Sequence, residues 1–91
     1  MLMVTKRSGG KEPFDPEKAK HSLAIASDEI RRPMGEGDLK GVIRELGAML
    51  EEKTEISTRH INIMLVGLLH VWGFHDVAAC YTKYSENMWQ A

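Results

Sequence analysis

Apolar residues recur every three or four positions along most of the chain, a spacing that is typical of amphipathic helices. The pattern predicts four helices, at about residues 15–32, 38–52, 58–72 and 76–89. Three of them carry one apolar stripe, whereas the third is apolar around its whole circumference between Ile61 and Trp72. We therefore expect this third helix to be the buried, central one of a bundle.

Capping residues define the ends of two of these helices. Asp15 and Pro16 suit the N-cap and the first position of the first helix. Either Ser57 or Thr58 can cap the third helix. Gly73 is expected to end it, because glycine accepts the left-handed conformation found just after many helices.

The beginning of the chain follows a different pattern. The segments "MVTKR" and "KEPF" are typical of two short strands, joined by a three-residue turn at Ser8, Gly9 and Gly10. Pro13 has no N–H to donate, so the second strand is expected at a sheet edge. The whole pattern predicts a β-hairpin cap at about residues 3–14 over a four-helix bundle. This is an α+β fold that is mostly α, formed as a single domain over residues 1–91.

Composition argues against several classes of binding partner and site. The chain has 91 residues, with 12 Lys and Arg against 13 Asp and Glu, which gives a net charge of −1. This balance provides no general attraction to nucleic acid or to an anionic membrane. One cysteine excludes a disulfide framework and a thiolate zinc finger. Without a signal peptide or a long apolar run, we expect a cytoplasmic protein that does not enter a membrane.

The basic residues are distributed unevenly. Five of them crowd the N-terminal fifth of the chain: Lys6, Arg7, Lys11, Lys18 and Lys20. The stretch is not a P-loop, because G-x-x-x-x-G-K-[ST] would require glycine at Thr5 and a hydroxyl residue at Glu12. The free N–H groups at the start of the first and third helices could still hold an anion. The alternative that these spacings leave open is an ordinary charged hairpin beside a well-capped helix.

No catalytic constellation stands out in the sequence. It has no evident carboxylate pair, Ser-His-Asp order or activated thiol. The four histidines are scattered, and His70 and His75 are five positions apart rather than the four that a helical zinc site prefers. The sequence therefore predicts neither a catalytic nor a metal site, and a protein that is not an enzyme.

Taken together, four segments resemble the ATP-cone. This small regulatory nucleotide-binding domain occurs at the N-terminus of many ribonucleotide reductase large subunits and in the repressor of reductase genes. "VTKRSG" (residues 4–9) is similar to the family's V-x-K-R-[DN]-G strand. "FDPEK" (14–18) is similar to its apolar residue, Asp or Asn, and Glu-Lys pair. "EISTRHI" (55–61) and "VAACYTKY" (77–84) resemble its two later segments.

The resemblance implies that ATP or dATP binds between a β-cap and the helices without being hydrolysed; Mg²⁺ could accompany the nucleotide. By position, it implies eight nucleotide-binding residues: Val4 and Phe14 near the base, Glu12 and Lys18 at the base or sugar, and Lys6, Arg7, Thr58 and Asn62 near the phosphates. In some members Tyr81 and Tyr84 line the same region.

Three functions remain open at this point. The first is a nucleotide sensor that signals to a protein partner or a homo-oligomer, as in the allosteric control of ribonucleotide reductase. The second is a nucleotide-responsive transcription regulator of the reductase-repressor type, which would need a further module to bind DNA. The third is a helical adaptor that has lost its ligand. Ser8 in place of the family's usual Asp, and Ala19 in place of a larger aliphatic residue, keep this third function open.

Overall fold

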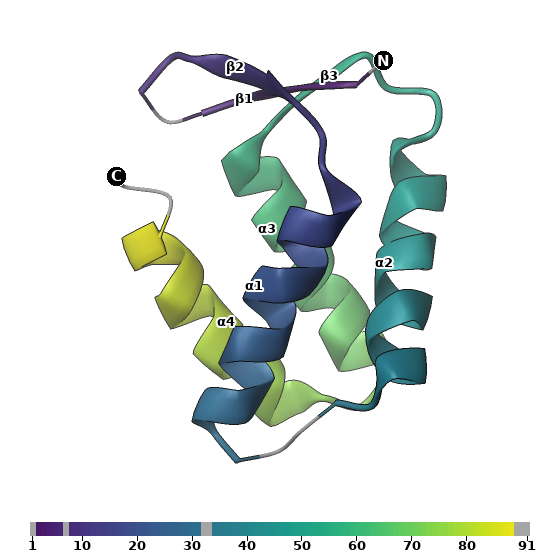
Figure 1. Cartoon of the computed structure of the whole chain (residues 1–91), viewed down its shortest axis with the longest axis vertical. Helices are drawn as coiled ribbons and strands as arrows, with labels where there is room; N and C mark the ends of the chain where they lie inside the picture. The colour runs from purple at the N-terminus through teal and green to yellow at the C-terminus, as the bar shows by residue number, and fades with distance from the viewer. Residues whose placement is uncertain (1, 7, 32–33, 89–91) are drawn as a thin grey trace.

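The computed structural model describes residues 2–6, 8–31 and 34–88. It consists of a small sheet on one end of four helices (Figure 1). In chain order the elements are β1 (Met3–Thr5), β2 (Lys11–Pro13), α1 (Pro16–Glu29), α2 (Glu36–Leu50), β3 (Glu55–Ser57), α3 (Thr58–Val71) and α4 (His75–Met88). The structure thus confirms the α+β, mostly α fold that the sequence pattern predicts.

The sheet has three strands in the order β2-β1-β3, so the predicted hairpin of β1 and β2 is confirmed, and β3 is a third strand that the sequence pattern did not predict. β2 runs antiparallel to β1, whereas β3 runs parallel to it and places Ile56 beside Val4. Both side chains are buried against the bundle. β2 is an edge strand, as Pro13 indicates.

The turn of the hairpin is longer than the predicted three residues, because the strands end at Thr5 and begin again at Lys11. The N–H of Lys6 donates to the carbonyl of Gly10 over 2.7 Å and closes the loop. Gly9 has a φ of 94°, which its missing Cβ permits.

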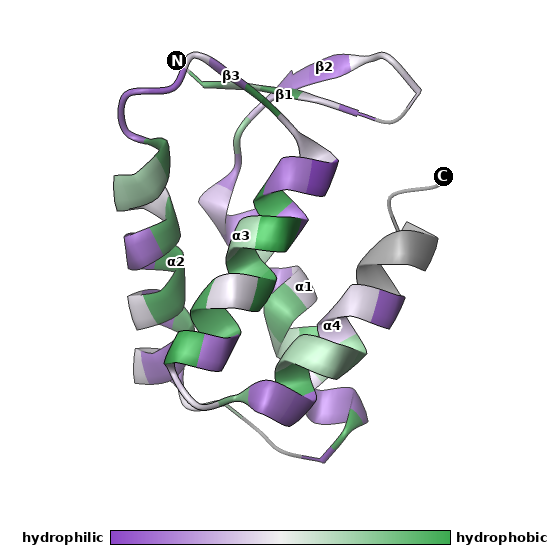
Figure 2. Ribbon diagram, turned by 180° about the vertical axis from the view of Figure 1, so that it is seen from behind, coloured by the Kyte–Doolittle hydropathy of each residue, from purple (hydrophilic) through white to green (hydrophobic). Residues whose placement is uncertain are grey.

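The four helices form a closed ring in which α1 and α3 each contact both α2 and α4. α1 and α3 therefore lie on a diagonal (Figure 1). The expectation that the third helix is buried on all sides is wrong, because its outer face is open to solvent. Ile63 is 61% exposed and Val71 79% exposed on this helix. Figure 2, which views the domain from behind, shows several apolar positions in green along α3.

The core lies between the helices and under the sheet. The largest buried side chains are Tyr81, Leu23, Leu46, Leu65, Leu69, Val42 and Val77. These residues belong to the predicted stripes of all four helices, and burying such side chains stabilises the bundle by about 1.5–3 kcal/mol each. Met49, which also belongs to the predicted stripe of α2, is 47% exposed instead.

The predicted caps are confirmed. The Asp15 carboxylate accepts the N–H of Glu17 at 3.0 Å, and Ser57 rather than Thr58 caps α3 by accepting the N–H of His60 at 3.1 Å. Gly73 follows α3 with a φ of 86°. The helix limits differ by at most three residues from those predicted: α1 ends at Glu29 instead of 32, and α2 covers 36–50 instead of 38–52.

In the described part of the chain, no helix is both long enough and apolar enough to cross a membrane.

Candidate functional site

A pocket opens where the sheet meets the bundle. Its lining comes from β1, β2, the start of α1, α3 and α4: Val4, Glu12, Pro13, Phe14, Asp15, Lys18, Ala19, Ile61 and Tyr81. The pocket has a volume of about 30 Å³, which is room for about two water molecules. A nucleotide base can therefore enter only if the sheet or the lining side chains move.

The inner wall of the pocket is apolar. Val4 on β1, Ile61 on α3 and Tyr81 on α4 are buried, and Phe14 between β2 and α1 is half-buried. Val4 faces inward because alternate residues of a strand point to opposite faces of the sheet. Apolar and aromatic walls of this kind suit the flat face of a base.

The outer rim of the pocket is charged and has Glu12 at its centre. One carboxylate oxygen of Glu12 lies 3.2 Å from Nζ of Lys6, and the other lies 3.1 Å from Nζ of Lys18. Hydrogen bonds from Lys18 and then Lys6 hold the pKa of Glu12 below its ordinary value. The three side chains together carry a net charge of +1, so a phosphate group that approaches the lysines must compete with Glu12.

The start of α3 lies beside the end of β1. Because β1 and β3 are parallel and Thr5 pairs with Ser57, the chain leaves both strands at the same edge of the sheet. Lys6 follows β1 there, and Thr58 begins α3. Thr58 is only 4% exposed, and within the described residues its hydroxyl has no hydrogen-bond partner. A helix N-terminus with a buried hydroxyl and a nearby lysine favours an anion.

A short polar chain links three helices next to the pocket. The buried Tyr81 hydroxyl donates to Oδ1 of Asn62 over 3.3 Å. It also lies 3.3 Å from Oγ of Ser22, and that Oγ donates to the carbonyl of Ala19 over 2.8 Å. Each hydroxyl has one proton, so the two hydroxyls bond to each other only when one of them releases its other acceptor. The chain therefore connects α1, α3 and α4, and it holds Asn62 in a fixed orientation.

The structure brings four of the eight predicted residues into the lining of one pocket: Val4, Glu12, Phe14 and Lys18. Lys6 reaches the pocket rim through Glu12. Thr58 and Asn62 lie on the first turns of α3, the helix whose Ile61 lines the pocket. Arg7 is outside the described residues.

Other residues of the site were not predicted from the sequence. Pro13, Asp15, Ala19 and Ile61 line the pocket, although they were not among the eight. Each of them is adjacent in sequence to a predicted residue or lies within one helical turn of one. This proximity was the signal that could have identified them. Ser22 was also missed, and its only signal is a small polar residue beside the apolar stripe of α1.

Two further features of the described part of the chain bear on metal binding and catalysis. There, no group of three or more His, Cys, Asp or Glu side chains could hold a metal ion. Burial, and then the nearby Glu29 carboxylate, raise the pKa of the Cys80 thiol. A raised pKa makes a thiol a poorer nucleophile at neutral pH.

The described residues thus form a small β-cap over four helices, with a pocket of apolar wall and charged rim between them. The sequence matches the ATP cone domain over residues 2–87, so the chain belongs to the ATP-cone family. ATP-cone domains generally bind ATP or dATP, and they are regulatory rather than catalytic. No curated protein matches the chain.

Proposed function

We propose that this domain binds ATP or dATP at the pocket under the sheet, does not hydrolyse it, and signals to a protein partner or to a second copy of itself. The observation that carries the proposal is the junction of apolar wall, lysine pair and helix N-terminus in a member of the ATP-cone family. A ribonucleotide reductase in the cytoplasm is the partner that the family suggests, with ATP permitting its activity and dATP inhibiting it.

In this proposal the base packs against Val4 and Phe14, and the phosphates extend toward Lys6 and the start of α3. The Thr58 hydroxyl supplies a donor that has no other partner within the described residues. Arg7 follows Lys6 in the sequence and adds a second cation to the same segment. Mg²⁺ binds through the phosphate oxygens of the nucleotide.

The absence of hydrolysis follows from the chemistry of the carboxylate. Phosphoryl transfer to water needs a group that orients or deprotonates the attacking water. Two carboxylates of the described residues line the pocket. Glu12 is held by two lysines, and its lowered pKa makes it a weak base. Asp15 accepts the N–H of Glu17 as the N-cap of α1. The site thus has groups suited to binding phosphate, and the proposed regulatory role needs binding without hydrolysis.

The small volume of the pocket links binding to a change of conformation, and a change of conformation is what a partner can detect. Pockets that enclose a small molecule usually have volumes of about 300–1,000 Å³, whereas this one has about 30 Å³. Binding must therefore favour a conformation in which the sheet or Phe14 has moved. A ligand with a few kcal/mol of preference for that conformation is enough to shift the population.

The first test is thermal unfolding of the chain with ATP, dATP, GTP or no nucleotide, each with Mg²⁺. A ligand at about 100 times its Kd adds roughly 2.7 kcal/mol of stability, which raises the Tm by several degrees in a domain of this size. We expect the shift with the adenine nucleotides and not with GTP. An absence of any shift would favour the adaptor that has lost its ligand.

Variants then test the position of the site. Lys6→Ala and Lys18→Ala should each remove most of the shift, because both lysines line the charged rim. Lys40→Ala is the matched control, since Lys40 is an exposed lysine on α2. An unchanged shift in the Lys6 and Lys18 variants would contradict the proposed position.

A further inference from the structure

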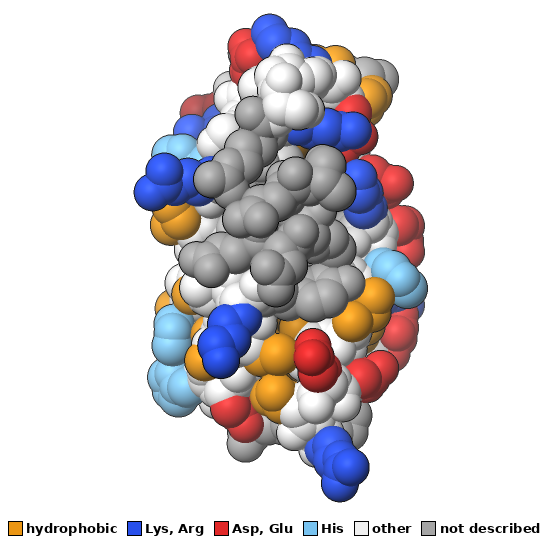
Figure 3. All heavy atoms as spheres, turned by 90° about the vertical axis from the view of Figure 1, so that its left-hand side faces the viewer, with side chains coloured by type: hydrophobic (Ala, Val, Ile, Leu, Met, Phe, Trp, Pro, Cys, Tyr) orange, Lys and Arg blue, Asp and Glu red, His pale blue; other side chains and the backbone are white. Residues whose placement is uncertain are grey.

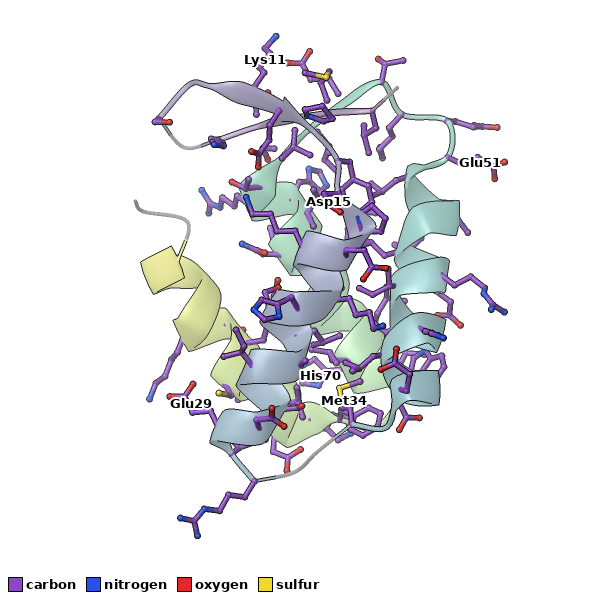
Figure 4. The ribbon with its side chains drawn as sticks, in the orientation of Figure 1. Lys11, Asp15, Glu29, Met34, Glu51 and His70 are labelled. Atoms are coloured by element: carbon purple, nitrogen blue, oxygen red, sulfur yellow. The ribbon has the colours of Figure 1, made fainter. Side chains whose placement is uncertain are left out.

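Two imidazole rings face each other at the turn between α3 and α4. Nδ1 of His70 lies 2.7 Å from Nδ1 of His75, and the ring centroids are 5.0 Å apart. Both side chains are exposed. His70 lies far from Lys11 and Asp15 at the cap end (Figure 4), and histidine side chains are at the surface in the lower half of the face in Figure 3.

The backbone between the two rings is fixed by hydrogen bonds. The N–H of Gly73 donates to the carbonyl of His70 over 3.1 Å, and the N–H of Phe74 donates to that of Leu69 over 2.8 Å. This pair of bonds, with Gly73 in the left-handed conformation, is a Schellman motif. The motif turns the chain so that His75 begins α4 opposite the last turn of α3. Residues five apart in sequence can therefore meet here, although they could not do so on one straight helix.

We propose that His70 and His75 form a two-imidazole binding site for a late first-row divalent metal ion, with Cu²⁺ preferred to Ni²⁺ and Zn²⁺. Imidazole nitrogens bind such ions at about 2.0–2.1 Å. Two neighbouring nitrogens are then about 2.9 Å apart in a square-planar complex and about 3.3 Å apart in a tetrahedral one. The observed 2.7 Å is short enough that a small ring movement reaches either arrangement. Cu²⁺ is preferred because imidazole sites bind it more strongly than Ni²⁺ or Zn²⁺ in the divalent series.

The protons of the two rings allow this binding. At 2.7 Å the rings share one proton, so one Nδ1 carries it and the other presents a lone pair. Metal binding needs both Nδ1 lone pairs, and the shared proton then moves to Nε2 of the same ring. The hydrogen bond between the rings is thereby replaced by two bonds to the ion, and water fills the remaining positions of the ion.

The proposal assigns the ion two protein ligands, the Nδ1 atoms of His70 and His75. Asp76 follows His75 directly, but its Oδ1 accepts the N–H of Val77 at 3.1 Å. Within the described residues no third His, Cys, Asp or Glu completes a cluster. The site is therefore a chelate of two residues, and the loss of either ring leaves a single ligand.

The test titrates the full, tag-free chain with CuCl₂, NiCl₂, ZnCl₂ and MgCl₂, in the absence of nucleotide and in competition with glycine. His70→Gln and His75→Gln should each weaken Cu²⁺ binding about 100-fold, because the second contact of a chelate forms at a high effective concentration. His60→Gln is the matched control, since His60 is exposed on the same helix, and it should bind as the wild type does. Equal losses in all three variants, or none in the first two, would overturn the proposal.

A second measurement uses the unaltered chain and does not depend on the folding of variants. Paramagnetic Cu²⁺ broadens the NMR signals of nearby amides. We expect residues 70–76 to broaden first, at substoichiometric Cu²⁺, with a two-nitrogen signature in the electron paramagnetic resonance spectrum. Broadening that begins around His21 or His60 would overturn the assignment.

Discussion

The indole ring of Trp72 lies against the backbone of Gly41, where the end of α3 packs on α2. A Cβ atom at position 41 would lie 2.3 Å from Cη2 of the ring. One turn further along α2, Glu45 accepts the indole N–H at 3.2 Å and holds the ring in place. Gly41 thus permits a close approach that no other residue allows, and this explains a glycine in the middle of a helix.

Gly41→Ala should therefore destabilise the domain, although alanine is the better helix former. Overpacking of this kind costs about 1–3 kcal/mol. The matched control is Gly47→Ala on the same helix, where an added Cβ would meet nothing within 4 Å. That change should stabilise the domain by about 0.5–1 kcal/mol, since alanine loses less backbone entropy than glycine on folding. Urea unfolding of both variants measures the two effects, and equal signs would contradict the packing.

The helices were predictable because their signals are local. A period of three to four residues, Asp15 as an N-cap and Gly73 as the end of a helix each depend on a few neighbouring positions. β3 was not predictable in the same way. It is three residues long, and its partner strand lies some 50 positions earlier in the chain. The exposure of the outer face of α3 could not be predicted either, because the sequence does not show which helices are in contact and which lie diagonally across the bundle.

Part of the candidate site was also predictable from local signals. Lys6 follows β1 two positions after Val4, and the hairpin register pairs Val4 with Glu12, which is therefore diagonal to Lys6. The pairing of Glu12 with two lysines depends on this register and on where α1 begins. Residue spacing alone shows neither the register nor the start of α1. The sequence therefore predicted Lys6 and Lys18 as site residues, but not that both pair with Glu12.

Glu12 should make a pH-dependent contribution to stability. Its ordinary pKa is 4.5, and Lys18 and Lys6 lower the value in the folded domain. A carboxylate with a lowered folded pKa stabilises the fold above its unfolded pKa, and this contribution is lost as the pH falls through the folded value. Glu12→Gln should therefore be less stable than the wild type at pH 7, and the difference should shrink below pH 4.5. The difference is small because the pair is partly exposed.

Urea unfolding of both proteins at pH 7 and at pH 3 measures this effect. A stability difference that stays constant across that range would show that the carboxylate charge contributes nothing and that only the shape of the side chain matters.

The same variant should separate phosphate binding from base recognition. Glu12→Gln removes a carboxylate charge from beside Lys6 and Lys18, so inorganic tripolyphosphate should bind more tightly than to the wild type. If Glu12 also contacts the base or sugar, as the family resemblance implies, ATP should gain less than tripolyphosphate or should lose affinity. Isothermal titration with both ligands gives the two ratios.

Glu55→Gln is the matched control for that titration. Glu55 is also a carboxylate of the sheet held by a lysine, with Lys11 at 2.8 Å, but it is not among the residues that line the pocket. It should change neither affinity appreciably. Equal gains for tripolyphosphate in both variants would mean that overall charge, and not the Glu12 pairing, controls phosphate binding.

The polar chain through Tyr81 should couple the helices around the pocket. Tyr81→Phe removes a fully buried hydroxyl and leaves Asn62 and Ser22 without that partner, which should cost about 1–3 kcal/mol. Ser22→Ala should cost less, because the buried Tyr81 hydroxyl keeps Asn62 as its acceptor. If Tyr81 and Ser22 interact, the double variant should lose less stability than the sum of the single losses, with a coupling of about 0.5 kcal/mol or more. Urea unfolding of the four proteins closes this cycle, and strict additivity would mean that the 3.3 Å contact between the two hydroxyls contributes nothing to stability.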